Sequence, residues 1–156
     1  MITSHGSPVG ATILAPRDMQ RLRQACPDLD NWPRSWRYDG DDIAVGQQIV
    51  EALTPFLLDL LDQRLATKTV SRHRDNLWVL GGELVRRCHE HSDLARQDVT
   101  SAIQQLIADD AGPLIYPRIR ESQQDSLDAT CRKLHRFMRD SKSTMHAVGA
   151  AKRTHK

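Results

Sequence analysis

The sequence of 156 residues is poor in aromatic residues and in long apolar runs. Aromatic residues make up 4% of the chain, so its apolar content is mostly aliphatic, as in helical bundles. No run approaches the roughly 18 apolar residues of a membrane span. Residues 1–15 lack the basic start and the long apolar stretch of a signal peptide. We therefore expect one domain with a real core and no membrane partner.

Cysteine is also scarce, and its pattern excludes a disulfide framework. The three cysteines, Cys26, Cys88 and Cys131, are an odd number at wide spacing. Two of them fall on the apolar faces of predicted helices. The pattern therefore predicts free, buried thiols and a cytoplasmic protein.

Catalytic motifs are missing as well. The sequence contains no Gly-x-Ser-x-Gly, no Walker loop and no His-Glu-x-x-His. Cys88-His89-x-His91 and Cys131-x-x-x-His135 offer metal-ligand types, but neither has the paired spacing of a structural zinc site. Tyr116 has no ordered base or oxyanion site beside it. We predict a protein that is not an enzyme, with no cofactor, metal or small-molecule substrate.

The longest stretch of helical periodicity runs from Thr67 to His91. Its apolar stripe predicts a helix that faces the core, with members at Val70, Leu77, Leu80, Leu84 and Cys88. Thr67 is the predicted N-cap. Each residue of the Gly81-Gly82 pair costs about 1 kcal/mol against alanine inside a helix. The pair indicates either close approach of a neighbouring backbone or a kink, and the sequence leaves both open.

We predict an all-α fold, a compact bundle of four to five helices. The predicted main helices cover residues 41–64, 67–91, 92–108 and 123–139. Pro55 either kinks the first of these or splits it in two, and Ser122-x-x-Asp125 resembles a capping box for the last. The predicted division is an N-terminal arm (1–40) with a short helix at 16–26, a helical domain (41–140) and a disordered basic tail (141–156).

The arm contains a turn-rich segment in which Trp32, Trp36 and Tyr38 alternate with arginine. Such a segment stacks on bases or pins a loop across a helical core. We favour the packing role, because buried aromatic residues commonly serve packing.

Charge is distributed unevenly. Residues 1–113 contain 12 Lys or Arg and 16 Asp or Glu, whereas residues 114–156 contain 10 and 4. On the last predicted helix Arg132, Arg136 and Arg139 form one outward row, spaced to meet successive phosphates. The alternative is a solvated helix face paired with nearby aspartates.

A second group of basic residues lies at the start of the central helix. It consists of Lys68, Arg72 and Arg74. A helix N-terminus also favours phosphate through its free amides. The rest of that helix face carries mixed signs, which indicates ion pairs on the helix surface as much as a binding site.

Four short motifs occur in an order that resembles a known family. They are Phe56-Leu57-x-x-Leu60-Leu61, Leu65-Ala66-Thr67-Lys68-Thr69-Val70, Asp98-Val99-Thr100 and Leu134-x-Arg136-Phe137-Met138. Over residues 45–140 this pattern is similar to the N-terminal core-binding, or SAM-like, domain of tyrosine recombinases (phage integrases). The chain departs from the family at Ala66, where serine is usual, and in a longer connector at 110–121. The family's catalytic domain has no counterpart in these 156 residues.

The resemblance implies binding of double-stranded DNA without strand cleavage, with Thr67, Lys68, Thr69 and Arg72 at the start of a DNA-facing helix. We therefore predict a non-catalytic DNA-binding domain, accessory to a site-specific recombinase or mobile element. The predicted DNA-binding residues are Lys68, Arg72, Arg74, Arg132, Arg136 and Arg139. The alternative is a protein-interaction module that docks on a recombinase or self-associates through the Trp32–Tyr38 loop.

Overall fold

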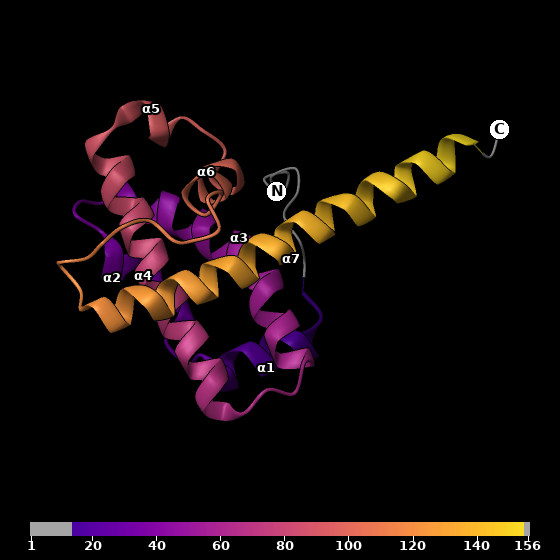
Figure 1. The fold of residues 1–156 in the computed structure, drawn as a ribbon, viewed down its shortest axis with the longest axis horizontal. Helices are drawn as coiled ribbons and strands as arrows, with labels where there is room; N and C mark the ends of the chain where they lie inside the picture. The colour runs from indigo at the N-terminus through magenta and orange to yellow at the C-terminus, as the bar shows by residue number, and fades with distance from the viewer. Residues whose placement is uncertain (1–13, 155–156) are drawn as a thin grey trace, which may run out of the picture.

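The computed structural model describes the backbone of residues 14–154 and the side chains of residues 14–141. Within this range the chain contains seven α-helices, one 3-10 helix and no strand, which confirms the predicted all-α class (Figure 1). The elements are α1 (Pro16–Ala25), η2 (Leu29–Asn31), α2 (Trp32–Trp36), α3 (Asp42–Asp62), α4 (Thr67–Glu90), α5 (Ser92–Ala95), α6 (Val99–Leu106) and α7 (Glu121–Thr154). The first 13 residues of the predicted N-terminal arm lie outside the described residues.

The core is built around α3 and α4. Leu53, Phe56 and Leu60 of α3 are at most 1% exposed, and so are Leu77 and the other stripe leucines of α4. Pro55 lies inside a single helix, so α3 is not split in two. By length and composition α3 is apolar enough to cross a membrane. One face of this helix, with Ile49, Leu53, Phe56, Leu57 and Leu60, is buried in the core cluster, and 33% of the apolar window is buried.

The central predicted helix is α4, and its bounds agree with the periodicity. The predicted cap is wrong by one residue. Ala66, not Thr67, precedes the helix in an extended conformation, and its carbonyl accepts from the amides of Thr69 and Val70. No side chain caps this end.

The tryptophan segment packs into the core as a short wedge. Trp32 and Trp36 are 2% and 5% exposed. A Cβ atom on Gly81 would lie 2.4 Å from the ring of Trp36, and one on Gly46 would lie 2.8 Å from Cα of Pro33. The glycine in α4 therefore admits a neighbour at close range, as one alternative held, but that neighbour is an indole ring rather than a backbone. Because α1 and α2 both contact α3, the packed bundle extends upstream of residue 41.

The third predicted helix, residues 92–108, is wrong as a single element. It divides into α5 and α6. Asp98 adopts an extended conformation between them, and its carboxylate accepts from the amide of Ser101 at 3.1 Å. An aspartate that caps a new helix ends the preceding one.

The last helix, α7, is longer at both ends than the sequence predicts. It begins at Glu121, where Gln123 Oε1 accepts from the amide of Arg120 at 2.9 Å, so the predicted Ser122–Asp125 capping box is wrong. It also continues to Thr154 through most of the predicted loose tail. That stretch contains no proline and several alanines, which favour helix. Figure 1 shows the C-terminal part of α7 extending away from the other helices.

Candidate functional site

A polar seam joins α4 to α7. His73 Nδ1 and Thr130 Oγ1 lie 2.8 Å apart, with both residues buried. Asn76 Nδ2 donates to Ser126 Oγ at 2.9 Å and to Thr130 Oγ1 at 2.8 Å. These hydrogen bonds fix the position of α4 relative to α7.

Two cations lie close to this seam, one on each helix. Burial lowers the pKa of His73, and the positive charges of Lys133 and Arg72 lower it further. Arg72 is exposed and Lys133 is half-buried. The contact between His73 and Thr130 thus places Arg72, the neighbour of His73, on the same side of the two helices' junction as Lys133, which follows Thr130 by about one turn.

Further along α7, Lys133 and Arg136 line an open cleft of about 650 Å³ against α3. Lys68 is exposed and lies one turn before Arg72 on α4. We call Lys68, Arg72, Lys133 and Arg136 the basic flank. Carboxylates are also present at this cleft, in Asp59 and Asp140, and they reduce the local positive charge.

Two further residues of the predicted row lie nearer to α6. Arg132 and Arg139 are both exposed. Arg132 Nη1 donates to the carbonyl of Asp110 at 3.4 Å. Arg139 lies 3.7 Å from the carboxylate of Asp140 and lines a second cleft, against α6. The row is therefore exposed along its length, with weak partners within the chain.

Arg74 is placed apart from the other predicted residues. Its Nη1 donates to the carbonyl of Ala25 at 3.2 Å, and its Nε and Nη2 donate to Asp75. With Arg21 it lines a cleft between α1 and α4. Arg74 therefore binds the C-terminal end of α1 and is not part of the basic flank.

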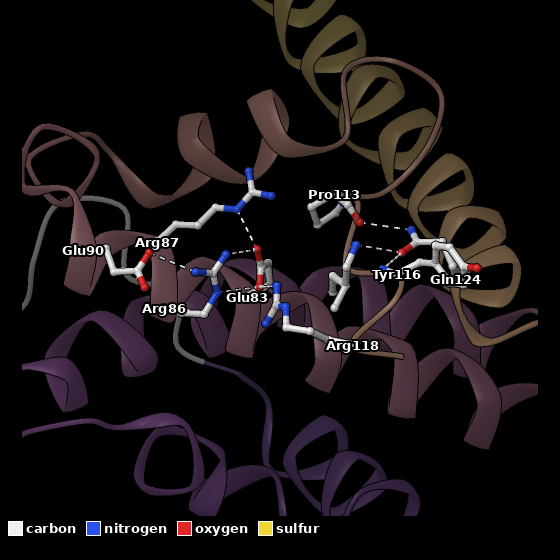
Figure 2. A network of polar contacts seen from close by, with 9 residues as sticks. Glu83, Arg86, Arg87, Glu90, Pro113, Tyr116, Arg118 and Gln124 are labelled. Atoms are coloured by element: carbon white, nitrogen blue, oxygen red, sulfur yellow. Dashed lines mark hydrogen bonds and ion pairs between the residues drawn. The ribbon is translucent and has the colours of Figure 1, made fainter. Parts of the chain in front are cut away.

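The strongest charged cluster is one that the sequence predicts only in part (Figure 2). Glu83 is 4% exposed and accepts hydrogen bonds of 2.7 to 3.0 Å from Arg86, Arg87 and Arg118. Burial opposes ionisation of Glu83, but these guanidinium groups lower its pKa to about 2. The two arginines of α4 are at helical spacing and can be found from the sequence. Arg118 lies in the connector after α6, and no sequence signal pairs it with Glu83.

Gln124 fixes that connector to α7 (Figure 2). Its Oε1 accepts from the amides of Ile115 and Tyr116 at 2.8 and 3.0 Å, and its Nε2 donates to the carbonyl of Pro113 at 3.0 Å. Gln124 is 7% exposed, so these bonds lie inside the protein. The connector is consequently held in place although it contains no regular element.

Three side chains could hold a metal ion among the residues that the structure describes. They are Asp39, Asp42 and His89, whose ligand atoms lie within 4.8 Å of one another. Asp42 Oδ2 already accepts from the amides of Tyr38 and Asp39 at 2.8 and 3.0 Å and lies 3.4 Å from His89 Nδ1. Burial opposes ionisation of Asp42, yet those amides hold its pKa below the usual value. The cluster joins the loop before α3 to the end of α4.

The cysteines lie outside this cluster. Cys26, Cys88 and Cys131 are all buried and free, as predicted. Burial raises the pKa of the Cys26 and Cys131 thiols to about 12. Both thiols therefore stay protonated at neutral pH and are poor nucleophiles or ligands.

The sequence has no significant match among protein-family models, curated proteins or solved structures. The resemblance to the core-binding domain of tyrosine recombinases therefore stays a prediction. Of the predicted basic residues, Arg72 lies next to the buried His73, whereas Arg136 lines the cleft against α3 and Arg139 the cleft against α6.

Proposed function

We propose that this chain is a non-catalytic DNA-binding domain that contacts phosphates through the basic flank and the outward arginines of α7. The supporting observation is the His73–Thr130 contact at 2.8 Å, because Arg72 adjoins His73 on α4 and Lys133 follows Thr130 by about one turn on α7. Cations gathered from two helices raise the local potential more than either helix does alone. A duplex lying across the seam would meet them together.

The charge along α7 also supports the proposal. Residues 121–129 contain three carboxylates and no Lys or Arg, whereas residues 130–154 contain seven Lys or Arg and one Asp. The C-terminal part of α7, from Thr130 onward, is therefore strongly basic. A basic helix of this kind supplies the sequence-independent attraction that dominates affinity for DNA.

The non-catalytic part of the proposal rests on what the candidate nucleophiles can do. The thiols of Cys26 and Cys131 are buried and protonated. The accessory role, beside a site-specific recombinase or mobile element, rests on the family resemblance. Three free thiols suit the reducing cytoplasm, where we place the protein.

The test measures binding to a labelled DNA duplex by fluorescence anisotropy at increasing salt. We expect log Kobs to fall linearly with log salt, with a slope of several units. Arg72→Ala and Arg136→Ala should each reduce that slope by about 1 and weaken binding to all sequences alike. Arg74→Ala is the matched control, because this arginine faces α1, and it should leave the slope unchanged.

Two outcomes contradict the proposal. One is the absence of duplex binding at low salt. The other is an equal loss in the Arg74→Ala and Arg136→Ala proteins, because a general loss of charge would then explain both.

The alternative function, a protein-interaction module, needs a different contact surface from the one predicted. Trp32 and Trp36 belong to the core, so they cannot form the contact while the bundle stays folded. Tyr38 and Trp78 are 58% and 41% exposed, and they favour a surface on the outer side of α2 and α4.

A further inference from the structure

A groove runs along the outer side of α4, between the α2 segment and the connector that precedes α7. Its volume is about 300 Å³. Tyr38 and Trp78 supply aromatic surface, Ile115 and Ile119 an aliphatic wall, and Arg86 and Arg118 the charge. None of these residues belongs to the basic flank, so the groove is a separate surface.

The aromatic side chains of the groove are fixed by contacts within the chain itself. Trp78 Nε1 donates to Ser35 Oγ at 2.9 Å, and Ser35 Oγ donates to the carbonyl of Trp32 at 2.7 Å. Tyr38 stacks on His89 with ring centroids 4.9 Å apart. Exposed aromatic rings that are already fixed lose little entropy on binding, which is the property of residues that dominate interfaces.

The exposed charge among the residues that line the groove is positive, and Glu90, outside the lining, pairs with Arg86 at 2.9 Å. Glu83 is the only carboxylate among the residues that line it, and its side chain is 2% exposed. Arg118 is bonded to Glu83 at 3.0 Å, yet its side chain is 54% exposed. Glu83 thus orients Arg86 and Arg118 without presenting negative charge to a ligand.

We propose that this groove binds an acidic peptide segment of a partner protein. One bulky apolar side chain of the segment packs on Trp78 against Ile115 and Ile119. A carboxylate beside that anchor pairs with Arg118, whose side chain is 54% exposed, while Arg86 stays bonded to Glu83 and Glu90. The aliphatic wall favours a side chain over a nucleic-acid base, because non-specific base binding needs stacking faces along a basic track.

The test uses a panel of short fluorescein-labelled peptides in which Leu, Phe or Trp is flanked on both sides by Glu. Matched peptides carry Gln in place of Glu, and a single-stranded oligothymidine serves as the nucleic-acid probe. We expect the acidic peptides to bind about tenfold more tightly than the Gln peptides. In NMR spectra the indole N–H signal of Trp78 should shift on binding, while that of buried Trp32 should not.

Variants locate the site and separate it from DNA binding. Trp78→Ala and Arg118→Gln should each weaken peptide binding by about tenfold and leave duplex binding unchanged. Arg136→Ala should do the reverse. Arg118→Gln keeps the argument testable if Trp78→Ala unfolds, because Arg118 is exposed and buried Glu83 keeps its bonds to Arg86 and Arg87.

The proposal is overturned if no acidic peptide of the panel binds more tightly than its Gln counterpart. It is also overturned if Arg118→Gln binds the peptides as the unaltered protein does. Tighter binding of oligothymidine at Trp78, or burial of Trp78 by a second copy of the chain, would assign the groove to a different partner.

Discussion

At the scale of single residues, the packing of Trp36 accounts for the glycine in the middle of α4. Its ring fills the space above Gly81, and its Nε1 donates to the carbonyl of Trp78 at 3.0 Å. The packing of one indole thereby offsets the cost of glycine in α4. The glycine pair could be read from the sequence as a close approach, but the identity of the neighbour could not, because Trp36 lies far away in the chain.

Gly81→Ala should destabilise the protein by about 1–3 kcal/mol, because the new methyl group must displace the Trp36 ring. Gly82→Ala should cost less, since its Cβ would lie 3.2 Å from the nearest Trp36 atom. Gly40→Ala meets nothing within 4 Å and serves as the control. Urea unfolding curves should rank the three in this order. Equal stability of all three proteins would refute the close packing of Trp36 against Gly81.

His73 should make stability depend on pH. Its pKa is lowered in the folded protein by burial and by two neighbouring cations, so the unfolded chain binds the proton more tightly. Stability is therefore complete above about pH 6.5 and falls as the pH drops below that value, by at most about 1.4 kcal/mol per pH unit. In His73→Gln, unfolding midpoints measured between about pH 7.5 and 5 should vary less with pH. An unchanged pH profile would rule out His73 as the cause.

At the scale of elements, a single buried carboxylate connects α4 to the connector before α7. Glu83 binds two arginines of its own helix and one from the connector, and Gln124 fixes the same connector from the other side. A segment without regular structure is held by these polar bonds and by Ile115 in the core. Its placement depends on contacts between residues distant in sequence, which periodicity cannot reveal.

Glu83→Gln should lower the free energy of unfolding by about 1–3 kcal/mol at neutral pH, because three charge-assisted hydrogen bonds weaken. The folded pKa is about 2, against an ordinary value of 4.5. The contribution of Glu83 is therefore present above pH 4.5 and is lost as the pH falls toward 2. The variant should lack this acid-dependent loss. Glu90→Gln is the control, since Glu90 is half exposed and binds Arg86 alone. A similar effect of both changes would argue against a special role for Glu83.

The helices themselves could be predicted from the sequence to different extents. Those with a strong apolar stripe, α1 and α4, agree with prediction to within a residue or two at each end. The short helix α2 was missed, because five residues that include proline show no periodicity. The continuation of α7 was missed because a basic, small-residue segment satisfies helix propensity as well as it suits a loose tail.

At the scale of the whole molecule, the bundle and the outer part of α7 are separable. Among described side chains, the last residues of α7 that pack on the core are Phe137 and Met138. The candidate DNA-binding residues of α4 and α7 were chosen from their spacing, and their role stays a prediction. The set omits Lys133, which lines the same cleft as Arg136, and includes Arg74, which faces α1.

Removal of residues 142–156 should leave the stability of the bundle unchanged within about 0.5 kcal/mol, because no described core contact is lost. Affinity for duplex DNA should fall, since the removed segment contains four Lys or Arg and no carboxylate. Thermal unfolding and the salt dependence of DNA binding measure the two effects. A large drop in stability would place the outer helix in the core, and unchanged affinity would remove it from the DNA surface.

The length of α7 also determines how far from the helical bundle the protein can contact DNA. At 1.5 Å per residue, the stretch from residue 139 to Thr154 spans about 24 Å, comparable to seven base pairs of a duplex. If the bundle binds one DNA segment, the outer part of α7 would contact DNA on one side of that segment only. The region of DNA that the protein protects would then be asymmetric about the bundle.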